Sequence, residues 1–319
     1  VWTSGATESD NLAIAGGARY RAHQGRHLVT MKSEHKAVTD VFARLVRDGF
    51  EVPWVEPRSD GVLDDGDRAA ALRGDTLLVS IMLVNNETGV IQDVDERGAR
   101  CRERDSLFHV DAAQAVGKVP VELSNLPVDL MSMTAHKCYG PKGIGALYIA
   151  DRPACHVEPL LFGGGQQRRI RPGTLPTELI AGFGMAAEIA ADRIDTDLAH
   201  LRELRRILWN GIGQIDGLLL NGHHDGFPGI LNVSVEGVEG ESLLLDLEPL
   251  LVATGSACKS KTQEPSYVLR ALGRTDLEAQ SAIRFIFGRQ TTVADIEFAA
   301  ARYRAAVERL PDLAPGVAA

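Results

Sequence analysis

Twenty-six positions separate Asp111 from Lys137, and each of the two residues closely follows a short apolar run. We interpret these runs, residues 107–110 and 128–133, as buried strands that carry an acid and an amine at their ends. Such a pair suits a pocket for pyridoxal phosphate (PLP). The lysine forms a Schiff base with the aldehyde, and the aspartate keeps the pyridine nitrogen protonated so that the ring accepts electrons. An N-cap on a helix that begins at Asp111 is the alternative.

Lys137 favours the cofactor interpretation, because a lysine at the inner end of a strand is poorly explained as a solvated charge. Its amine becomes reactive when it is desolvated. Gln114, three residues after Asp111, could donate a hydrogen bond to the ring hydroxyl. Together these residues predict a PLP site on this part of the chain.

Small residues near the start of the chain predict a phosphate site. Gly5, Ala6 and Thr7 lie between an expected strand and an expected helix, and free N–H groups in a first helical turn bind anions. An ordinary tight turn capped by Thr7 or Ser9 explains the same residues. Thr174, at the end of a glycine-rich segment, is either a further phosphate donor to a neighbouring subunit's cofactor or part of a flexible loop.

Two polar residues follow other expected strands. His35 could stack on a flat cofactor and move protons near neutral pH, or it could cap the helix that begins beside it. Asn86 could donate to a ring oxygen or to a substrate carboxylate, or it could serve only the geometry of a turn. Both residues are candidates on position alone.

Cys258 lies among small and polar residues, where an exposed thiol is expected. The neighbouring Lys259 and Lys261 favour its thiolate form, although an inert surface cysteine fits the same pattern. Arg284 is a charge inside the apolar run 281–288. It could hold a substrate carboxylate through two hydrogen bonds, or it could belong to a structural ion pair.

The order of the expected elements predicts an α/β fold. Apolar strands near residues 27–31, 76–83, 107–112, 128–133 and 144–149 alternate with helical segments, which is typical of a mainly parallel sheet covered by helices. Ligands bind at the carboxyl ends of such strands. We expect a large cofactor-binding domain over residues 1–190 and a smaller α+β domain over residues 191–319. Because the chain opens directly on a strand, we also expect that its first strand and an upstream segment are missing.

Composition excludes several classes of protein. The chain has 319 residues and a formal net charge of −9, which argues against direct nucleic-acid binding. Its four cysteines have no metal-ligand spacing, so no metal site is expected. Few cysteines in a large acidic chain favour a reducing cytoplasm. No apolar run has the length of a membrane span.

Several motifs, taken in order, closely resemble the group I cysteine desulfurases, the NifS/IscS-like branch of the class V aminotransferase family. The motifs are TSGATESDNLAI, SEHKAV, VNNETGVIQDV, HVDAAQAVGK, AHKCYGPKGIGALY, RPGTLP, EGESLL, GSAC, EPSYVLRALG and SAIRFIFGRQTT. The resemblance implies a fold-type I PLP enzyme that works as a homodimer. It also implies conversion of L-cysteine to L-alanine, with sulfur held as a persulfide for iron–sulfur cluster assembly and tRNA thiolation.

The resemblance also implies a role for each matching residue. Lys137 is the Schiff-base lysine, Asp111 pairs with the pyridine nitrogen, His35 stacks on the ring and Gln114 contacts its hydroxyl. The residues implied to hold the phosphate are Ala6, Thr7, Thr134 and His136, together with Thr174 of the partner subunit.

The substrate side of the pocket is implied in the same way. Asn86, which also touches the cofactor, and Arg284 grip the substrate carboxylate, and Cys258 takes the sulfur. The implied partners are L-cysteine, a second copy of the chain, an iron–sulfur scaffold protein and other sulfur acceptors.

The chain departs from the family pattern in two respects, and other interpretations stay open. GSACKSK replaces the more usual GSACTSA and adds two positive charges around Cys258. By comparison with the family pattern, we also expect that a longer N-terminal segment and a longer C-terminal tail are missing. The alternatives are another class V enzyme, such as a selenocysteine lyase, and a truncated chain without activity.

Overall fold

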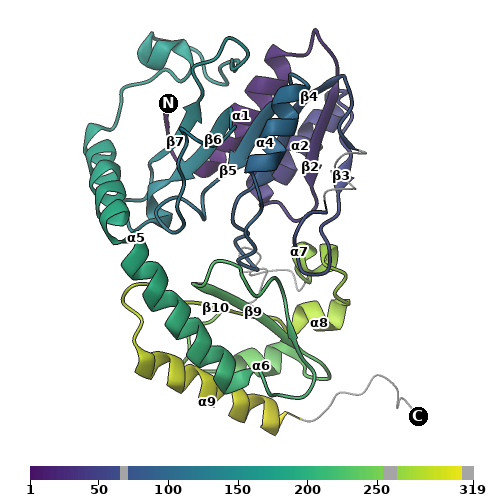
Figure 1. Ribbon diagram of the computed structural model, residues 1–319, viewed down its shortest axis with the longest axis vertical. Helices are drawn as coiled ribbons and strands as arrows, with labels where there is room; N and C mark the ends of the chain where they lie inside the picture. Colours follow the sequence, from purple (N-terminus) through teal and green to yellow (C-terminus); the bar gives the residue numbers. More distant parts are fainter. Residues whose placement is uncertain (65–70, 254–263, 311–319) are drawn as a thin grey trace. The chain divides into compact units, whose positions relative to one another are not determined.

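A computed structural model describes residues 1–64, 71–253 and 264–310, and the chain divides into two compact units (Figure 1). The first unit comprises residues 1–56, 63–85 and 91–194. The second comprises residues 57–62, 86–90 and 195–319. Two short segments from the first part of the chain therefore belong to the second unit.

The first unit is built on a seven-stranded sheet with the strand order β1-β7-β6-β5-β4-β2-β3. Its strands are β1 (Trp2–Thr3), β2 (His27–Met31), β3 (Trp54–Val55), β4 (Thr76–Met82), β5 (Leu107–Asp111), β6 (Leu130–Thr134) and β7 (Gly145–Ile149). Strands β3, β2, β4, β5 and β6 are parallel, whereas β7 is antiparallel to both β6 and β1. The expectation of a mainly parallel α/β sheet is confirmed.

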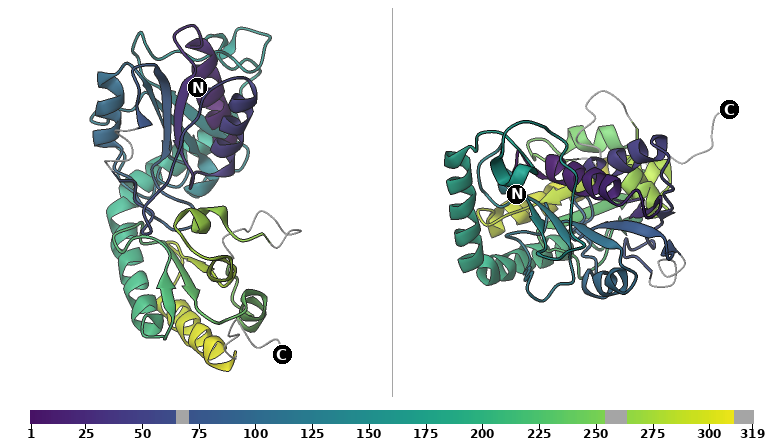
Figure 2. Two further views of the ribbon diagram at one scale, coloured as in Figure 1. Left: turned by 90° about the vertical axis from the view of Figure 1, so that its right-hand side faces the viewer. Right: turned by 90° about the horizontal axis from the view of Figure 1, so that it is seen from above.

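Helices cover both faces of this sheet. Helices α1 (Ala6–Tyr20) and α2 (Lys36–Arg47) lie on one face, and α4 (Asp95–Glu103) lies on the other (Figures 1 and 2). Helix α2 presents Val38, Val41, Phe42 and Leu45 to the core at helical spacing. Strands β4 and β5 are buried along their whole length, as expected for strands covered on both faces.

The turn between β5 and β6 differs from one expectation. Residues 113–118 form consecutive turns in place of the helix that Asp111 could have capped. Gly117 has φ +74, which ends a helical path, and a Cβ at this residue would lie 2.7 Å from the Cβ of Cys138. The consecutive turns therefore stop just after Gly117, and residues 119–129 lead on to β6.

The second unit contains an antiparallel sheet of three strands in the order β10-β9-β8. The strands are β8 (Leu218–Leu220), β9 (Ile230–Val235) and β10 (Ile283–Ile286), and the helices are α6 (Gly240–Asp246), α7 (Tyr267–Ala271), α8 (Asp276–Gln280) and α9 (Val293–Arg309). The fully buried ring of Tyr303 packs on Phe285 with 5.5 Å between ring centres. The smaller α+β pattern is thus present in this part of the chain.

Helix α5 (Thr177–Ile212) contributes its first part to the first unit and the remainder to the second. In the described residues, no helix has the length and apolar character that crossing a membrane requires. The same residues contain no group of three or more His, Cys, Asp or Glu side chains placed to hold a metal ion.

Candidate active site

Asp111 is the last residue of β5, and its side chain is buried. Its Oδ1 accepts a hydrogen bond of 2.9 Å from the N–H of Ala113. Burial raises the pKa of Asp111, while the Ala113 bond and the charge of His35 lower it. The structure therefore places His35 within electrostatic reach of Asp111. A buried carboxyl of this kind is stabilised best by a cationic hydrogen-bond donor.

A chain of buried polar groups includes His109, which lies two residues before Asp111 on the same strand. The Nδ1 of His109 lies 2.8 Å from Ser80 Oγ, and its Nε2 lies 2.9 Å from Ser132 Oγ. Burial lowers the pKa of His109 to about 3, so the ring is neutral. Asp10, fully buried on α1, has an Oδ1 atom 3.6 Å from Nε2 of His109.

Acidic groups accumulate in this part of the first unit. Burial and the neighbouring Asp111 raise the pKa of Asp10 well above its ordinary value. Burial and Asp111 also raise the pKa of Glu34, whose Oε1 accepts a 2.7 Å hydrogen bond from the Met82 N–H. Three buried acids so close together cannot all ionise at neutral pH. A positive charge held at Asp111 would relieve this repulsion.

The start of α1 lies beside the end of β6, where its first N–H groups suit an anion. Thr3 pairs with Gly145 on β7, and Gly145 pairs with Thr134 on β6, so the ends of the three strands lie at one level. A Cβ at Gly145 would lie 2.6 Å from the Cα of Gly5, which precedes the helix. This close approach brings the first turn of α1, with its N–H groups, next to Thr134.

The residues after β6 make this region positive. Lys137 ends the short 3₁₀ turn η1 (Ala135–Lys137), and both Lys137 and His136 are exposed. The Nδ1 of His136 lies 2.9 Å from Thr134 Oγ1. Burial and the nearby lysines Lys137, Lys142 and Lys118 lower the pKa of His136. A cluster of cations next to free N–H groups suits a phosphate.

The Gln114 side chain is oriented by Lys118, a residue that the sequence motifs did not single out. Lys118 donates a hydrogen bond to Oε1 of Gln114. Since the amide oxygen accepts from the lysine, the amide NH₂ is the end that can donate elsewhere. Burial and Lys137 lower the pKa of Lys118 to about 8. The spacing of four residues between Gln114 and Lys118 is the sequence feature that could have indicated this contact.

His35 is the N-cap of α2, as one reading of the sequence had it. Its Nδ1 accepts a 3.1 Å hydrogen bond from the Ala37 N–H, which orients the ring. His35 and Thr7 line one open cavity of about 430 Å³ between α1 and α2. That volume lies in the range of small-molecule sites.

The first unit therefore contains the two kinds of group that PLP requires. The N–H groups of α1, Thr134 and His136 suit the phosphate, and the buried Asp111 suits a protonated ring nitrogen. Lys137 lies three residues after the end of β6 and is exposed, so its amine is accessible. On this donor set the residues present fit the cofactor.

Thr174 lies in an exposed stretch that a salt bridge ties to α1. Arg171 donates to both carboxylate oxygens of Glu8, at 2.7 and 3.3 Å. Burial raises the pKa of Glu8, but the hydrogen bonds from Arg171 and Ser4 outweigh it, so the pKa lies below its ordinary value. The side chain of Thr174 is exposed within this unit.

Asn86 and Arg284 meet within the second unit. Nη1 of Arg284, on β10, donates a 2.8 Å hydrogen bond to the backbone carbonyl of Asn86. Both side chains are partly exposed. Cys258, with Lys259 and Lys261, lies outside the described residues.

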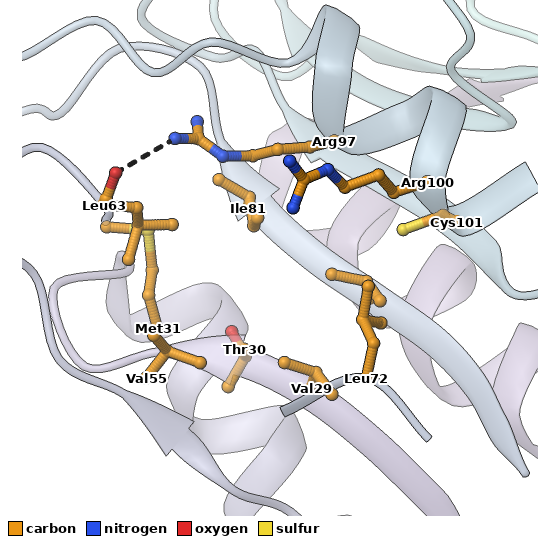
Figure 3. A pocket seen from close by; sticks show the side chains of 11 residues that line it. Val29, Thr30, Met31, Val55, Leu63, Leu72, Ile81, Arg97, Arg100 and Cys101 are labelled. Carbon is orange, nitrogen blue, oxygen red and sulfur yellow. Dashed lines mark hydrogen bonds between the residues drawn. The ribbon is translucent and has the colours of Figure 1, made fainter. Parts of the chain in front are cut away.

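An apolar pocket on another part of the first unit holds none of the predicted site residues (Figure 3). Arg97, at its edge, donates to the carbonyl of Leu63. Its cavity volume of about 20 Å³ holds roughly one water molecule, so PLP cannot bind there. Its lining residues are Val29, Thr30, Met31, Val55, Leu63, Leu72, Val79, Ile81, Arg97, Arg100 and Cys101.

Sequence and fold comparisons identify the family of the chain. Residues 1–298 match the family Aminotransferase class-V, and the chain belongs to that family. Enzymes of this family are PLP-dependent, and PLP is the cofactor of this chain. The fold is therefore that of the fold-type I PLP enzymes.

Particular relatives narrow the class. The chain is 52% identical over 316 residues to cysteine desulfurase IscS of Salmonella schwarzengrund, covering 99% of this chain and 78% of that protein. A solved NifS-like protein matches with a TM-score of 0.87 and 33% identity, over 97% of this chain and 82% of its own. SspA in complex with cysteine matches with a TM-score of 0.79 and 33% identity, over 92% and 82%. The expected resemblance to NifS/IscS-like enzymes is confirmed.

Proposed function

We propose that this protein is a cysteine desulfurase that converts L-cysteine to L-alanine and releases sulfur through Cys258. The observation that carries the proposal is its 52% identity, over nearly the whole chain, to relatives named cysteine desulfurase. The first unit supports it, because the charge of His35 acts on the buried Asp111 and the Thr134 hydroxyl lies beside His136.

Each residue of the first unit has a distinct task in this proposal. The bound cofactor supplies an electron sink for the charge that develops at the substrate α-carbon. Asp111 accepts the hydrogen bond of the ring nitrogen and keeps that nitrogen protonated. Lys137 holds the cofactor covalently and then moves the proton at the α-carbon. His35 stacks on the ring.

The remaining cofactor contacts hold the phosphate and the ring hydroxyl. The residues proposed to hold the phosphate are Ala6, Thr7, Thr134 and His136, with Thr174 of the partner subunit. Gln114, oriented by Lys118, donates to the ring hydroxyl, and Asn86 adds a donor at the cofactor. This arrangement is supported by the free N–H groups of α1 and by the lysines around His136.

Sulfur leaves the substrate by attack of the Cys258 thiolate. Asn86 and Arg284 orient the substrate through its carboxylate. The thiolate then forms an S–S bond while the substrate C–S bond breaks, and the electron pair stays with the carbon fragment. Protonation of that fragment completes L-alanine and leaves a persulfide on Cys258.

Several finer assignments belong to the same proposal. The enzyme works as a homodimer, because Thr174 is exposed within its own unit and is assigned to the partner's cofactor. Its persulfide passes to an iron–sulfur scaffold protein and to acceptors that serve tRNA thiolation. The low cysteine content of an acidic chain favours a reducing compartment, and we propose the cytoplasm. Residues 191–319 form the small domain that carries Cys258.

The test is production of alanine and sulfide from L-cysteine in the presence of a thiol reductant. Purified protein with PLP should absorb in the visible range, and borohydride should remove that band. Cys258→Ala should lose sulfide release and keep the band, whereas the control Cys101→Ala should keep both. Sulfide release by Cys258→Ala at the unmodified rate would refute the assignment of the nucleophile. Absence of sulfide and alanine from the unmodified protein would refute the function.

A further inference from the structure

The turn 86–90 of the second unit contains a buried carboxyl that the proposed reaction does not use. Glu87 is 5% exposed, and its Oε2 accepts a 2.5 Å hydrogen bond from the hydroxyl of Ser266. Ser266 is also buried and caps α7 by accepting from the Leu269 N–H. The backbone carbonyl of Glu87 accepts a 3.1 Å hydrogen bond from Asn232 on β9. Ser266 therefore holds the carboxyl of Glu87, and Asn232 holds its backbone.

Arg284 contacts the peptide group that joins Asn86 to Glu87. Its guanidinium donates to the carbonyl of Asn86, the residue immediately before Glu87. The Arg284 N–H donates a 2.8 Å hydrogen bond to the carbonyl of Ala253, which orients its strand. The charge of Arg284 acts on Glu87. Glu87 and the pair proposed to bind the substrate carboxylate are thus one cluster within a single unit.

We propose that Glu87 is a positioning residue that sets the pH range over which Asn86 and Arg284 bind the α-carboxylate of the amino-acid substrate. The inference rests on the proposed function, since that function assigns the carboxylate to this pair. When Glu87 is neutral, the positive charge of the Arg284 guanidinium is available to attract the substrate carboxylate. An ionised Glu87 competes for the same cation, so binding of an anionic substrate weakens.

The environment of Glu87 places this change near neutral pH. Burial raises the pKa of Glu87 to about 7, although the Ser266 hydrogen bond and Arg284 lower it. The charge of Arg284 on β10 acts on Glu87, whereas its hydrogen-bond partners Ser266 and Asn232 are neutral. A substrate carboxylate at Arg284 adds a negative charge that favours the protonated form of Glu87. By reciprocity, protonation of Glu87 tightens substrate binding.

The test compares KM and kcat for L-cysteine from pH 6 to pH 9 in the unmodified enzyme and in Glu87→Gln. The control is Glu236→Gln, which removes an exposed carboxyl of the same unit. Comparing proteins at equal pH cancels ionisation of the substrate itself. We expect the KM ratio of unmodified enzyme to Glu87→Gln to be constant below pH 6.5 and to rise about tenfold by pH 8.5. The kcat ratio should not change with pH, and Glu236→Gln should follow the unmodified enzyme.

A second variant tests the same inference if Glu87→Gln folds poorly. Ser266→Ala removes the hydrogen bond that lowers the pKa of Glu87, so the rise in KM should begin at higher pH. The melting temperature provides a readout that needs no turnover: Glu87→Gln should exceed the unmodified protein by several degrees at pH 8 and by less at pH 5.

Two results would overturn the inference. They are a KM ratio that does not change with pH in an active enzyme, and a Ser266→Ala profile that superimposes on the unmodified one. An unmodified enzyme that makes no alanine from L-cysteine at any pH contradicts the proposed function itself, which distinguishes the two failures.

Discussion

Gly145→Ala should weaken both the fold and PLP binding, because this glycine allows the start of α1 to lie against β7. A Cβ at residue 145 would lie 2.6 Å from Gly5 Cα, 2.7 Å from Gly5 C and 2.7 Å from the Met133 carbonyl oxygen. All three are main-chain atoms and cannot rotate away. To reach a tolerable 3.4 Å, the start of α1 must move by about 0.8 Å.

The size of that movement determines how much stability and how much PLP affinity we expect Gly145→Ala to lose. Overpacking costs about 1–3 kcal/mol, and we expect the upper half of this range because backbone from two elements is displaced. The same shift moves the N–H groups of α1 relative to Thr134 and His136. Loss of one charge-assisted hydrogen bond to the phosphate, about 2 kcal/mol, should raise the Kd for PLP at least tenfold.

Urea unfolding and PLP titration of the apo-protein measure the two effects separately. The matched control is Gly184→Ala on α5, where an added Cβ meets no atom within 4 Å. This control should be as stable as the unmodified protein or more stable, by up to about 1 kcal/mol, with unchanged Kd. A destabilised Gly145→Ala with normal PLP affinity would refute the link between β7 and the phosphate site. Unchanged stability would refute the close-packing argument altogether.

Two further predictions concern buried and partly buried polar groups of the first unit. His109→Leu should lower the free energy of unfolding by about 2–4 kcal/mol at pH 7.5, because Ser80 and Ser132 lose their partner. The pKa of His109 in the folded state is about 3, so below pH 6.5 the unfolded chain binds a proton that the folded chain does not bind. The free energy of unfolding of the unmodified protein should therefore fall by about 1.4 kcal/mol per pH unit below about pH 6.5, and the variant should not show this contribution. Arg171→Ala should cost about 1–2 kcal/mol at pH 7 by removing the two-point bond to Glu8. Because the pKa of Glu8 is lowered in the folded state, that difference should shrink as pH falls below 4.5, and urea titrations at pH 7 and pH 3.5 test it.

The fold could be predicted largely from periodic patterns. Short apolar runs predicted buried strands, and their alternation with helical segments predicted a mainly parallel sheet covered by helices. What the patterns could not show is the order of the strands. Strand β1 lies beside β7 because residues more than 140 positions apart pair, such as Thr3 with Gly145, and local sequence does not contain that pairing.

The candidate site was predicted in part. Residues at strand ends, such as Asp111 and Lys137, could be recognised because parallel strands direct their carboxyl ends to one edge. The assignment of the turn 86–90 to the second unit could not be recognised from the sequence. Asn86 follows a strand of the first unit but belongs to the second, because its turn bonds to Arg284 nearly two hundred positions later. Lys118 and Glu87 were missed because their roles depend on a neighbour that only folding supplies.

The sequence by itself determined the class of this protein, since the types and order of its chemical groups are those of a PLP enzyme, and the identity to cysteine desulfurases agrees with them. Tertiary structure decided the protonation state of those groups. A carboxyl changes its affinity for a proton only when water is removed from it and charges are brought near it. Asp111 acquires its acidic neighbours Asp10 and Glu34, and Glu87 acquires Ser266 and Arg284, because folding joins distant segments. The sequence determines which titratable residues are present, and tertiary packing determines their protonation.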